Sequence, residues 1–227
     1  MEKIPESFNL CIFQFFNLQD SISMSIFRVV VLSVFVLVSV DCQSQNADID
    51  WLRTINLERN EKLDPLFVVI THSDGPISIA LPATLLTIGL IKKDSLLKKD
   101  ALMITGSLVA STIVTVGMKW GIGRDRPFVT YPDLENLVPA GSPSFPSGHT
   151  SMAFSTATSL TIAYPKWYVY VPAFLWAGAV GYSRMHLGVH YPSDVFVGAL
   201  VGSGSAFLSS FVTDKLYAKR RSKALRL

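Results

Sequence analysis

Long apolar runs separated by short polar loops limit most strongly how this chain can fold. Five such runs follow residue 75, at 76–91, 101–118, 151–164, 167–182 and 195–212. Hydrophobic residues make up 49% of the 227 residues and charged residues only 16%, a balance too apolar for an ordinary water-soluble domain. We therefore expect an all-α, integral-membrane helical bundle with about five or six transmembrane helices, although several runs fall short of the ~20 residues that normally cross a bilayer.

The residues before these runs divide into two further segments. Residues 29–40, which contain only Val, Leu, Phe and Ser, follow Arg28, so residues 1–45 are expected to be a signal peptide or a first membrane segment. Met24 stands just ahead of that run, and we expect it to be the true start of the protein. Residues 46–75 mix apolar with charged residues, which predicts an amphipathic helix at the non-cytoplasmic interface or a soluble packing helix.

Basic residues are concentrated in three connections: the loop 92–99, Lys166, and the tail 215–227. If the runs cross a membrane in alternate directions, all three fall on one side, and short cytoplasmic loops are those that accumulate Lys and Arg. Residues 76–214 would then form one membrane domain, followed by a basic cytoplasmic tail at 215–227. The remaining polar clusters fall on the opposite face, which we expect to be the periplasmic side of a bacterial inner membrane.

The first polar cluster lies at the end of the second apolar run. Its sequence, Lys119-Trp-Gly-Ile-Gly-Arg124-Asp125-Arg126-Pro127, contains three cations. Cations at this depth are costly unless an anion compensates them, so they indicate either an anion site or side chains that extend to lipid headgroups. Arg124 and Asp125 either pair with each other or contact a substrate.

The second cluster, Pro146-Ser147-Gly148-His149, stands immediately before a predicted helix. Backbone N–H groups and the helix dipole can bind an anion there, and Gly148 would let it approach closely. The alternative is an ordinary helix start that Ser147 caps.

The third cluster runs from Ser183 to Asp194 and contains two histidines. Pro192 suits the first turn of the following helix, so Asp194 can accept a hydrogen bond from His190, four residues earlier, and leave the other ring nitrogen as a nucleophile or base. A structural His–Asp pair is the alternative. His186 either joins the site or is a hydrogen-bonded histidine at the interface.

Together the clusters supply cations, two histidines and one orienting acid, a combination that suits phosphoryl transfer. They resemble the three-part signature of the type 2 phosphatidic acid phosphatase superfamily, which includes membrane-associated lipid phosphatases and haloperoxidase-like proteins. The resemblance covers roughly residues 100–200 and rests on three motifs in the right order.

This resemblance implies a metal-independent, cofactor-free phosphatase. It implies that His190 attacks phosphorus to form a phosphohistidine, that His149 protonates the leaving oxygen, and that Asp194 orients His190. The phosphoryl oxygens would be bound by the remaining signature positions: Lys119, Arg126, Ser147, Gly148 and Arg184. The substrate would be a lipid phosphate or diphosphate in the membrane, such as undecaprenyl diphosphate, phosphatidylglycerol phosphate, phosphatidic acid or a lipid A phosphate.

Other functions stay open on the residues alone. A metal-dependent hydrolase with histidine and Asp194 ligands would leave the cations without a role. A soluble periplasmic acid phosphatase fits the short third run but not the basic tail, and a non-catalytic lipid-phosphate binder or transporter fits the basic pocket but not the His–Asp pair. Nucleic acid is excluded as a partner, because the net charge is only +3 and the basic residues do not alternate with aromatic ones.

Overall fold

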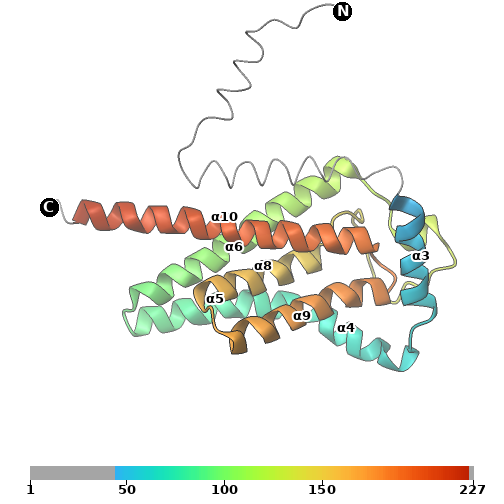
Figure 1. Ribbon diagram of the computed structural model, residues 1–227, viewed down its shortest axis with the longest axis horizontal. Helices are drawn as coiled ribbons and strands as arrows, with labels where there is room; N and C mark the ends of the chain where they lie inside the picture. Colours follow the sequence, from blue (N-terminus) through green and yellow to red (C-terminus); the bar gives the residue numbers. More distant parts are fainter. Residues whose placement is uncertain (1–43, 225–227) are drawn as a thin grey trace, which may run out of the picture. The chain divides into compact units, whose positions relative to one another are not determined.

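The computed structural model describes residues 44–224, which form helices and loops with no strand among them (Figure 1). In chain order these are α3 (Ser44–Leu57), the 3-10 helix η1 (Glu61–Leu63), α4 (Asp64–His72), α5 (Asp74–Ile91), α6 (Ser95–Ile122), α7 (Pro127–Thr130), α8 (Gly148–Ala163), α9 (Trp167–His186) and α10 (Pro192–Ala224). The expected all-α bundle is confirmed. The predictions for residues 29–40, for Met24 and for the last residues of the tail lie outside the described residues.

Local chemistry sets the ends of these helices. The Asp94 side chain accepts hydrogen bonds from the backbone N–H groups of Leu96 and Leu97 and so caps the start of α6. Gly123 ends α6 in the left-handed conformation, with φ of 66°, which a glycine adopts without steric cost. Pro192 begins α10, where its missing N–H costs no hydrogen bond. Each of the five apolar runs lies within or almost within one of α5, α6, α8, α9 and α10.

Helix α8 lies in the middle of the bundle and packs against α5, α6, α9 and α10 (Figure 1). Its buried face is made of small hydroxyl residues that hydrogen-bond to neighbouring helices, as in the pairs Ser155–Ser107 (2.5 Å), Thr156–Ser78 (2.7 Å) and Thr158–Ser203 (3.1 Å). Such pairs satisfy side chains that would otherwise be costly away from water. The Ser/Thr-rich run is therefore a central helix.

Glycines allow α10 to approach the backbone of α8 closely. A Cβ atom at Gly202 would lie 2.2 Å from the carbonyl oxygen of Ser151, and one at Gly198 would lie 2.7 Å from that of Ser147. No larger residue fits either position without moving a backbone segment. Glycine at these two positions thus sets the separation between the two helices.

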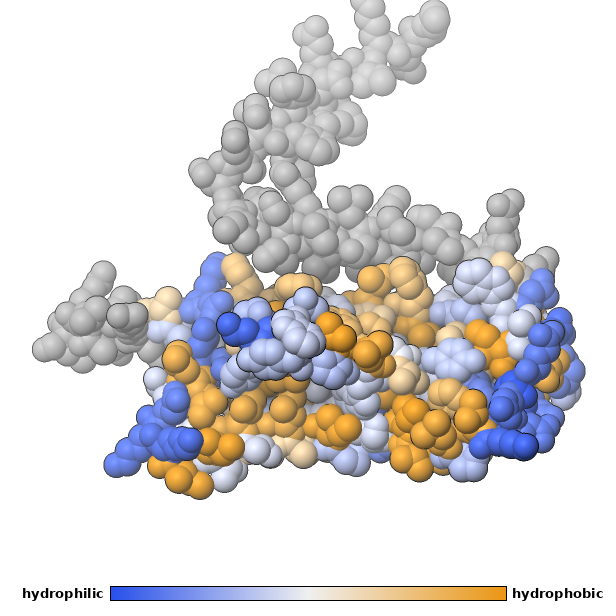
Figure 2. Space-filling view, turned by 60° about the horizontal axis from the view of Figure 1, so that its bottom comes forward, coloured by the Kyte–Doolittle hydropathy of each residue, from blue (hydrophilic) through white to orange (hydrophobic). Residues whose placement is uncertain are grey.

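On the face shown in Figure 2, many apolar side chains gather between two polar ends. Large residues such as Ile79, Ile113 and Leu175 are more than 60% exposed. Within residues 44–224, three helical stretches, Glu61–Ile91, Ser95–Thr130 and Pro192–Ala218, are long and apolar enough to cross a membrane. An apolar belt of this kind is stable in contact with lipid tails.

The two ends of the bundle differ in what they carry. The turn between α5 and α6, the turn between α8 and α9, and the C-terminal end of α10 share one end (Figure 1). These are the basic connections of the sequence. The loops that carry the three polar clusters lie at the other end, so the predicted segregation of basic loops from site residues is present.

The stretch 46–75 is not a single helix. It forms α3, then η1 and α4, and α4 leads almost directly into α5. Helix α3 is held to the site end by the buried Asn56, whose amide donates to the His186 carbonyl at 2.9 Å, and its exposed Arg53 pairs with Asp133 at the surface at 2.9 Å. It therefore packs on the loop 131–147 and on the end of α9.

Candidate active site

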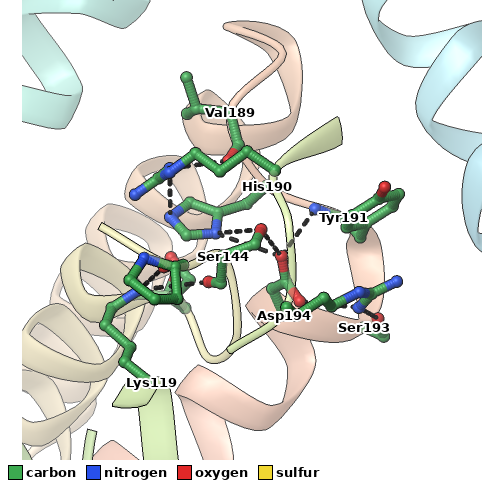
Figure 3. Close-up of polar contacts among 12 residues, drawn as sticks. Lys119, Ser144, Val189, His190, Tyr191, Ser193 and Asp194 are labelled. Carbon is green, nitrogen blue, oxygen red and sulfur yellow. Dashed lines mark hydrogen bonds and ion pairs between the residues drawn. The ribbon is translucent and has the colours of Figure 1, made fainter. Parts of the chain in front are cut away.

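His190 lies in the short loop between α9 and α10 and is 1% exposed. Gly188, with φ of 71°, shapes this loop, since a Cβ there would lie 2.1 Å from the Glu135 carbonyl oxygen. The Nδ1 atom of His190 faces Asp194 Oδ2 at 3.3 Å, and its Nε2 atom faces a guanidinium nitrogen of Arg126 at 3.4 Å (Figure 3). A guanidinium only donates hydrogen bonds, so Nε2 must present its lone pair and Nδ1 must carry the proton.

The environment of His190 keeps the imidazole neutral. Burial is the main cause and lowers its pKa to about 4; Asp194 opposes this shift, while Arg126 and Arg184 add to it. At neutral pH the Nε2 atom therefore carries no proton. A neutral imidazole oriented by a carboxylate is the arrangement that a nucleophilic histidine requires.

Two cations of the first cluster hold the loop before α8. The Lys119 ammonium donates to the carbonyl oxygens of Pro143 at 2.5 Å and Ser144 at 3.2 Å (Figure 3). The Arg126 guanidinium donates to the carbonyl oxygens of Ser142 and Val189, each at 2.8 Å. Both side chains are less than 10% exposed, and Arg126 reaches His190 directly. Arg126 thus stands beside the imidazole, and neither cation extends to the surface.

Arg184, near the end of α9, contributes a third buried cation and is 3% exposed. One terminal nitrogen donates to the Thr71 hydroxyl at 2.6 Å. Its Nε is one of two buried side-chain polar atoms without a hydrogen-bond partner among the described residues. A buried guanidinium donor without a partner is costly, and a phosphoryl oxygen would satisfy it.

The second cluster forms the first turn of α8. Ser147 is fully buried and precedes the helix, but its hydroxyl accepts a hydrogen bond from Thr150 instead of capping the backbone. A Cβ at Gly148 would lie 4.0 Å from Lys119 Cε, which places this turn against the lysine. The first backbone N–H groups of α8 lack helical acceptors and suit an anion.

His149 projects from this turn and is the most accessible of these side chains, with 39% exposure. Its Nε2 lies 4.0 Å from Asp74 Oδ1 at the start of α5. The imidazole also lies within electrostatic reach of Arg184, His190 and Arg126. An accessible imidazole beside a carboxylate can exchange protons with a bound molecule and with water.

The structure shows which groups Arg124 of the first cluster contacts. Arg124 does not pair with the exposed Asp125; it donates to Asp194 Oδ1 at 2.8 Å and to Asp48 Oδ2 at 2.9 Å. It therefore reaches the carboxylate that orients His190.

His186 is a structural histidine. Its Nε2 pairs with Asp64 Oδ1 at 2.7 Å, and its ring centroid lies 4.3 Å from that of Phe67. The side chain is 2% exposed and fixes the end of α9 to α4.

Three other residues near the site were given no role in the sequence analysis. Ser144 donates to Asp194 Oδ2 at 2.5 Å, Thr71 anchors Arg184, and Asp74 faces His149. The sequence contained one signal for Asp74: an acid beside a histidine at the start of an apolar run. Nothing local distinguished Ser144 and Thr71, since their partners lie 50 and 113 residues away in the chain.

The site as a whole is a cluster of cations around one neutral imidazole. Lys119, Arg126 and Arg184 supply positive charge, and the first turn of α8 supplies backbone N–H groups. Such an arrangement can stabilise the negative charge of a transferring phosphoryl group. It repels a metal cation, which favours the anion site over the alternative of a metal site.

Comparisons with known proteins agree with this geometry. The family model described as the PAP2 superfamily matches residues 100–217. An undecaprenyl-diphosphatase from Sulfolobus acidocaldarius is 29% identical over 180 residues, which cover 79% of this chain and 84% of that protein. A lipid A 4'-phosphatase from Bacteroides thetaiotaomicron is 33% identical over 107 residues, 44% of this chain and 48% of that protein.

A solved structure is also similar. The transmembrane PAP2-type phosphatidylglycerolphosphate phosphatase from Bacillus subtilis superposes with a TM-score of 0.67 and 26% identity, covering 85% of this chain and 96% of that structure. Together with the apolar helices, this similarity makes the chain an integral membrane protein.

Proposed function

Because the chain belongs to the PAP2 superfamily, we propose that it is a membrane phosphatase that hydrolyses a lipid phosphate or diphosphate through a phosphohistidine on His190. One observation carries this proposal: the buried Nε2 lone pair of His190 stands beside Arg126, and the same site includes the Nε donor of Arg184, which has no hydrogen-bond partner among the described residues. Phosphoryl transfer through a covalent intermediate requires a nucleophile and a set of cations that bind the phosphoryl oxygens, here Lys119, Arg126 and Arg184, which we call the cationic cradle.

In the first step, His190 Nε2 attacks phosphorus and the bond from phosphorus to the leaving oxygen breaks. His149, protonated before the step, gives its proton to that oxygen, so the lipid leaves as an alcohol or a monophosphate. Asp74 and the bound phosphate both favour the protonated form of His149, because each is an anion close to the imidazole. Asp194 accepts a hydrogen bond from Nδ1 and stabilises the positive charge that develops on His190.

In the second step, water replaces the lipid. His149, now neutral, takes a proton from the water as the water oxygen attacks phosphorus. The bond between phosphorus and Nε2 breaks, inorganic phosphate leaves, and both histidines return to their starting states. Lys119, Arg126, Arg184 and the Ser147–Gly148 turn bind the phosphoryl oxygens in both steps.

We propose that the reaction needs no metal ion. The three cations already provide the charge that a divalent ion supplies in other phosphoryl-transfer sites. Activity in the presence of a chelator is therefore expected.

The proposed substrate is a lipid whose phosphate reaches the polar end of the bundle while its tail stays beside the apolar belt. Undecaprenyl diphosphate is the first choice, because the relative with that activity aligns over most of both chains. Phosphatidylglycerol phosphate, phosphatidic acid and a lipid A phosphate are the alternatives. We place the site end on the periplasmic side of a bacterial inner membrane, because the basic turns lie at the opposite end.

The test is phosphate release by the full-length protein purified in detergent, with EDTA, on these four lipids and on a soluble aryl phosphate. Release from one lipid class supports the proposal and identifies the substrate. Turnover of the aryl ester alone favours a broad acid phosphatase, and activity that requires a divalent ion contradicts the metal-free mechanism. Tight binding of a lipid phosphate without turnover indicates a binder or transporter.

A further inference from the structure

Arg124 lies between two carboxylates at the edge of the site. Its guanidinium donates to Asp194 Oδ1 at 2.8 Å, to the Ser193 hydroxyl at 2.7 Å and to Asp48 Oδ2 at 2.9 Å. The guanidinium carbon also stands 3.8 Å from the ring centroid of Tyr191. Hydrogen bonds and the aromatic ring thus fix the side chain in one position.

The two oxygens of Asp194 have separate partners. Oδ2 faces His190 Nδ1 at 3.3 Å and accepts from the Ser144 hydroxyl and the Tyr191 backbone N–H, whereas Oδ1 pairs with Arg124 (Figure 3). The carboxylate has no exposed surface. Arg124 therefore determines how the carboxylate is turned toward His190 and offsets part of its charge.

Asp48 completes this arrangement from α3. Its Oδ2 pairs with Arg124, and its Oδ1 accepts the backbone N–H of Ser193 at 2.8 Å. Ser193 is the second residue of α10, so Asp48 caps that helix from a separate part of the chain. A single carboxylate thus connects α3 to both the arginine and the helix that carries Asp194.

We propose that Asp48 and Arg124 are positioning residues that act on His190 through Asp194, so that α3 is part of the catalytic apparatus. This inference rests on the proposed function. Arg124 lies between the signature positions of the first cluster, and Asp48 lies outside residues 100–217, which the family model matches.

We call the contacts from Asp48 through Arg124 and Asp194 to His190 the relay. Its effect can be measured as a change in the pKa of His190, which depends on the charges around the imidazole. The imidazole is faced by Asp194 from α10, Ser144 from the loop 131–147, Arg126 from the start of α7, and Arg184 and His149 from α9 and α8. Replacing Arg124 or Asp48 removes none of these residues, so a titration shift reports a change that reaches His190 through Asp194.

The two replacements should act in opposite directions. Without the Arg124 charge, Asp194 is less neutralised and favours the protonated imidazole, so the pKa of His190 rises. Without the Asp48 charge, Arg124 is less neutralised and weakens the effect of Asp194, so the pKa of His190 falls. A direct neighbour shifts a pKa by ~1–3 units, and for a charge one carboxylate further away we expect about 0.5–1 unit.

The experiment uses the full-length protein in detergent, labelled with 15N in its four histidines. Imidazole titrations are recorded for the wild type, Arg124→Gln and Asp48→Asn, and the His190 signal is assigned by its loss in His190→Ala. The rate of phosphate release gives kcat and KM. Phosphatidic acid is the probe substrate, and the other three lipids proposed above are measured in the same way. We expect opposite titration shifts, with kcat reduced about 10- to 100-fold and KM little changed.

Arg53→Gln is the matched control, because Arg53 lies on the same helix but pairs with Asp133 at the surface. It should leave the His190 titration and kcat unchanged. Ser193→Ala removes a hydroxyl without changing charge and should lower kcat without a titration shift.

Several results would overturn the relay: no shift, shifts in the same direction, or losses equal to those of Arg53→Gln. If Asp48→Asn does not fold, Arg124→Lys, which retains the charge, must keep the wild-type titration or the relay is wrong. The His190 pKa could shift in opposite directions in the two variants although the wild type releases phosphate from no lipid. That result would support the relay and contradict the proposed function.

Discussion

Arg184→Lys tests whether the cradle depends on the shape of the cation or only on its charge. The Arg184 guanidinium is almost fully buried, one nitrogen is bound to Thr71, and Nε has no hydrogen-bond partner within residues 44–224. A planar fork can give two parallel hydrogen bonds to a phosphoryl group, whereas an ammonium acts as a point charge on a flexible stem. The substitution therefore keeps the charge and removes the geometry.

The size of the effect follows from the hydrogen bonds involved. A hydrogen bond to a charged group is worth ~1.5–3 kcal/mol, and Lys should lose one such bond to the transferring group. Since ~1.4 kcal/mol corresponds to a factor of ten in rate, kcat/KM should fall by roughly 10- to 150-fold. Most of the loss should lie in kcat, because the oxygens gain charge in the transition state.

The assay is steady-state phosphate release by detergent-purified wild type and variant, on the best lipid of the panel. Thr71→Val is the matched control, since it removes the anchor of the guanidinium but leaves the guanidinium itself. It should cost less than Arg184→Lys. If Arg184→Lys retains kcat/KM within threefold of wild type, Arg184 does not bind the phosphoryl group through its fork.

Four further outcomes are expected. His190→Ala should lower kcat by about four orders of magnitude or more and abolish acid-labile phosphoprotein, while binding of the lipid phosphate persists; normal turnover would assign the nucleophile elsewhere. Because the pKa of His190 is about 4 and the nucleophile must be unprotonated, kcat/KM should decline through His190 only as the pH falls through about 4, and a His190-dependent loss near pH 6 would contradict this. Asp74→Asn should lower kcat about tenfold, because His149 loses the anion that favours its protonated form, and a change confined to KM would remove that role. Gly202→Ala should destabilise the protein by about 1–3 kcal/mol in thermal unfolding, whereas Gly204→Ala, which meets no atom within 4 Å, should not.

The sequence predicted those parts of the fold that depend on local pattern. The apolar runs located α5, α6, α8, α9 and α10, and the basic connections lie together at one end. The stretch 46–75 was less clear, because a mixture of charged and apolar residues does not determine where one amphipathic helix ends and the next begins. It contains α3, η1 and α4 instead of one helix.

Beyond the three motifs that the family resemblance brought together, the site could be anticipated only where its residues are close in sequence. His190 and Asp194 are four residues apart and meet as their spacing suggested. Asp48 and Ser193 are 145 residues apart, and no pattern in either segment indicates the other. Likewise, the sequence allowed His186 to join the site, and only the tertiary contact with Asp64 decides against this.

The glycine contacts between α8 and α10 have a consequence for how such a site can vary. His149 lies in the first turn of α8 and His190 lies two residues before α10, and Gly198 and Gly202 bring these two helices into backbone contact. The spacing of the proposed acid and nucleophile is therefore set by main-chain atoms, which are the same for every residue type. Substitutions elsewhere in the bundle have little means of changing that spacing. A new substrate preference would have to arise at exposed positions of α3 and of the loop 131–147, away from Asp48 and Ser144, while the reacting geometry stays constant.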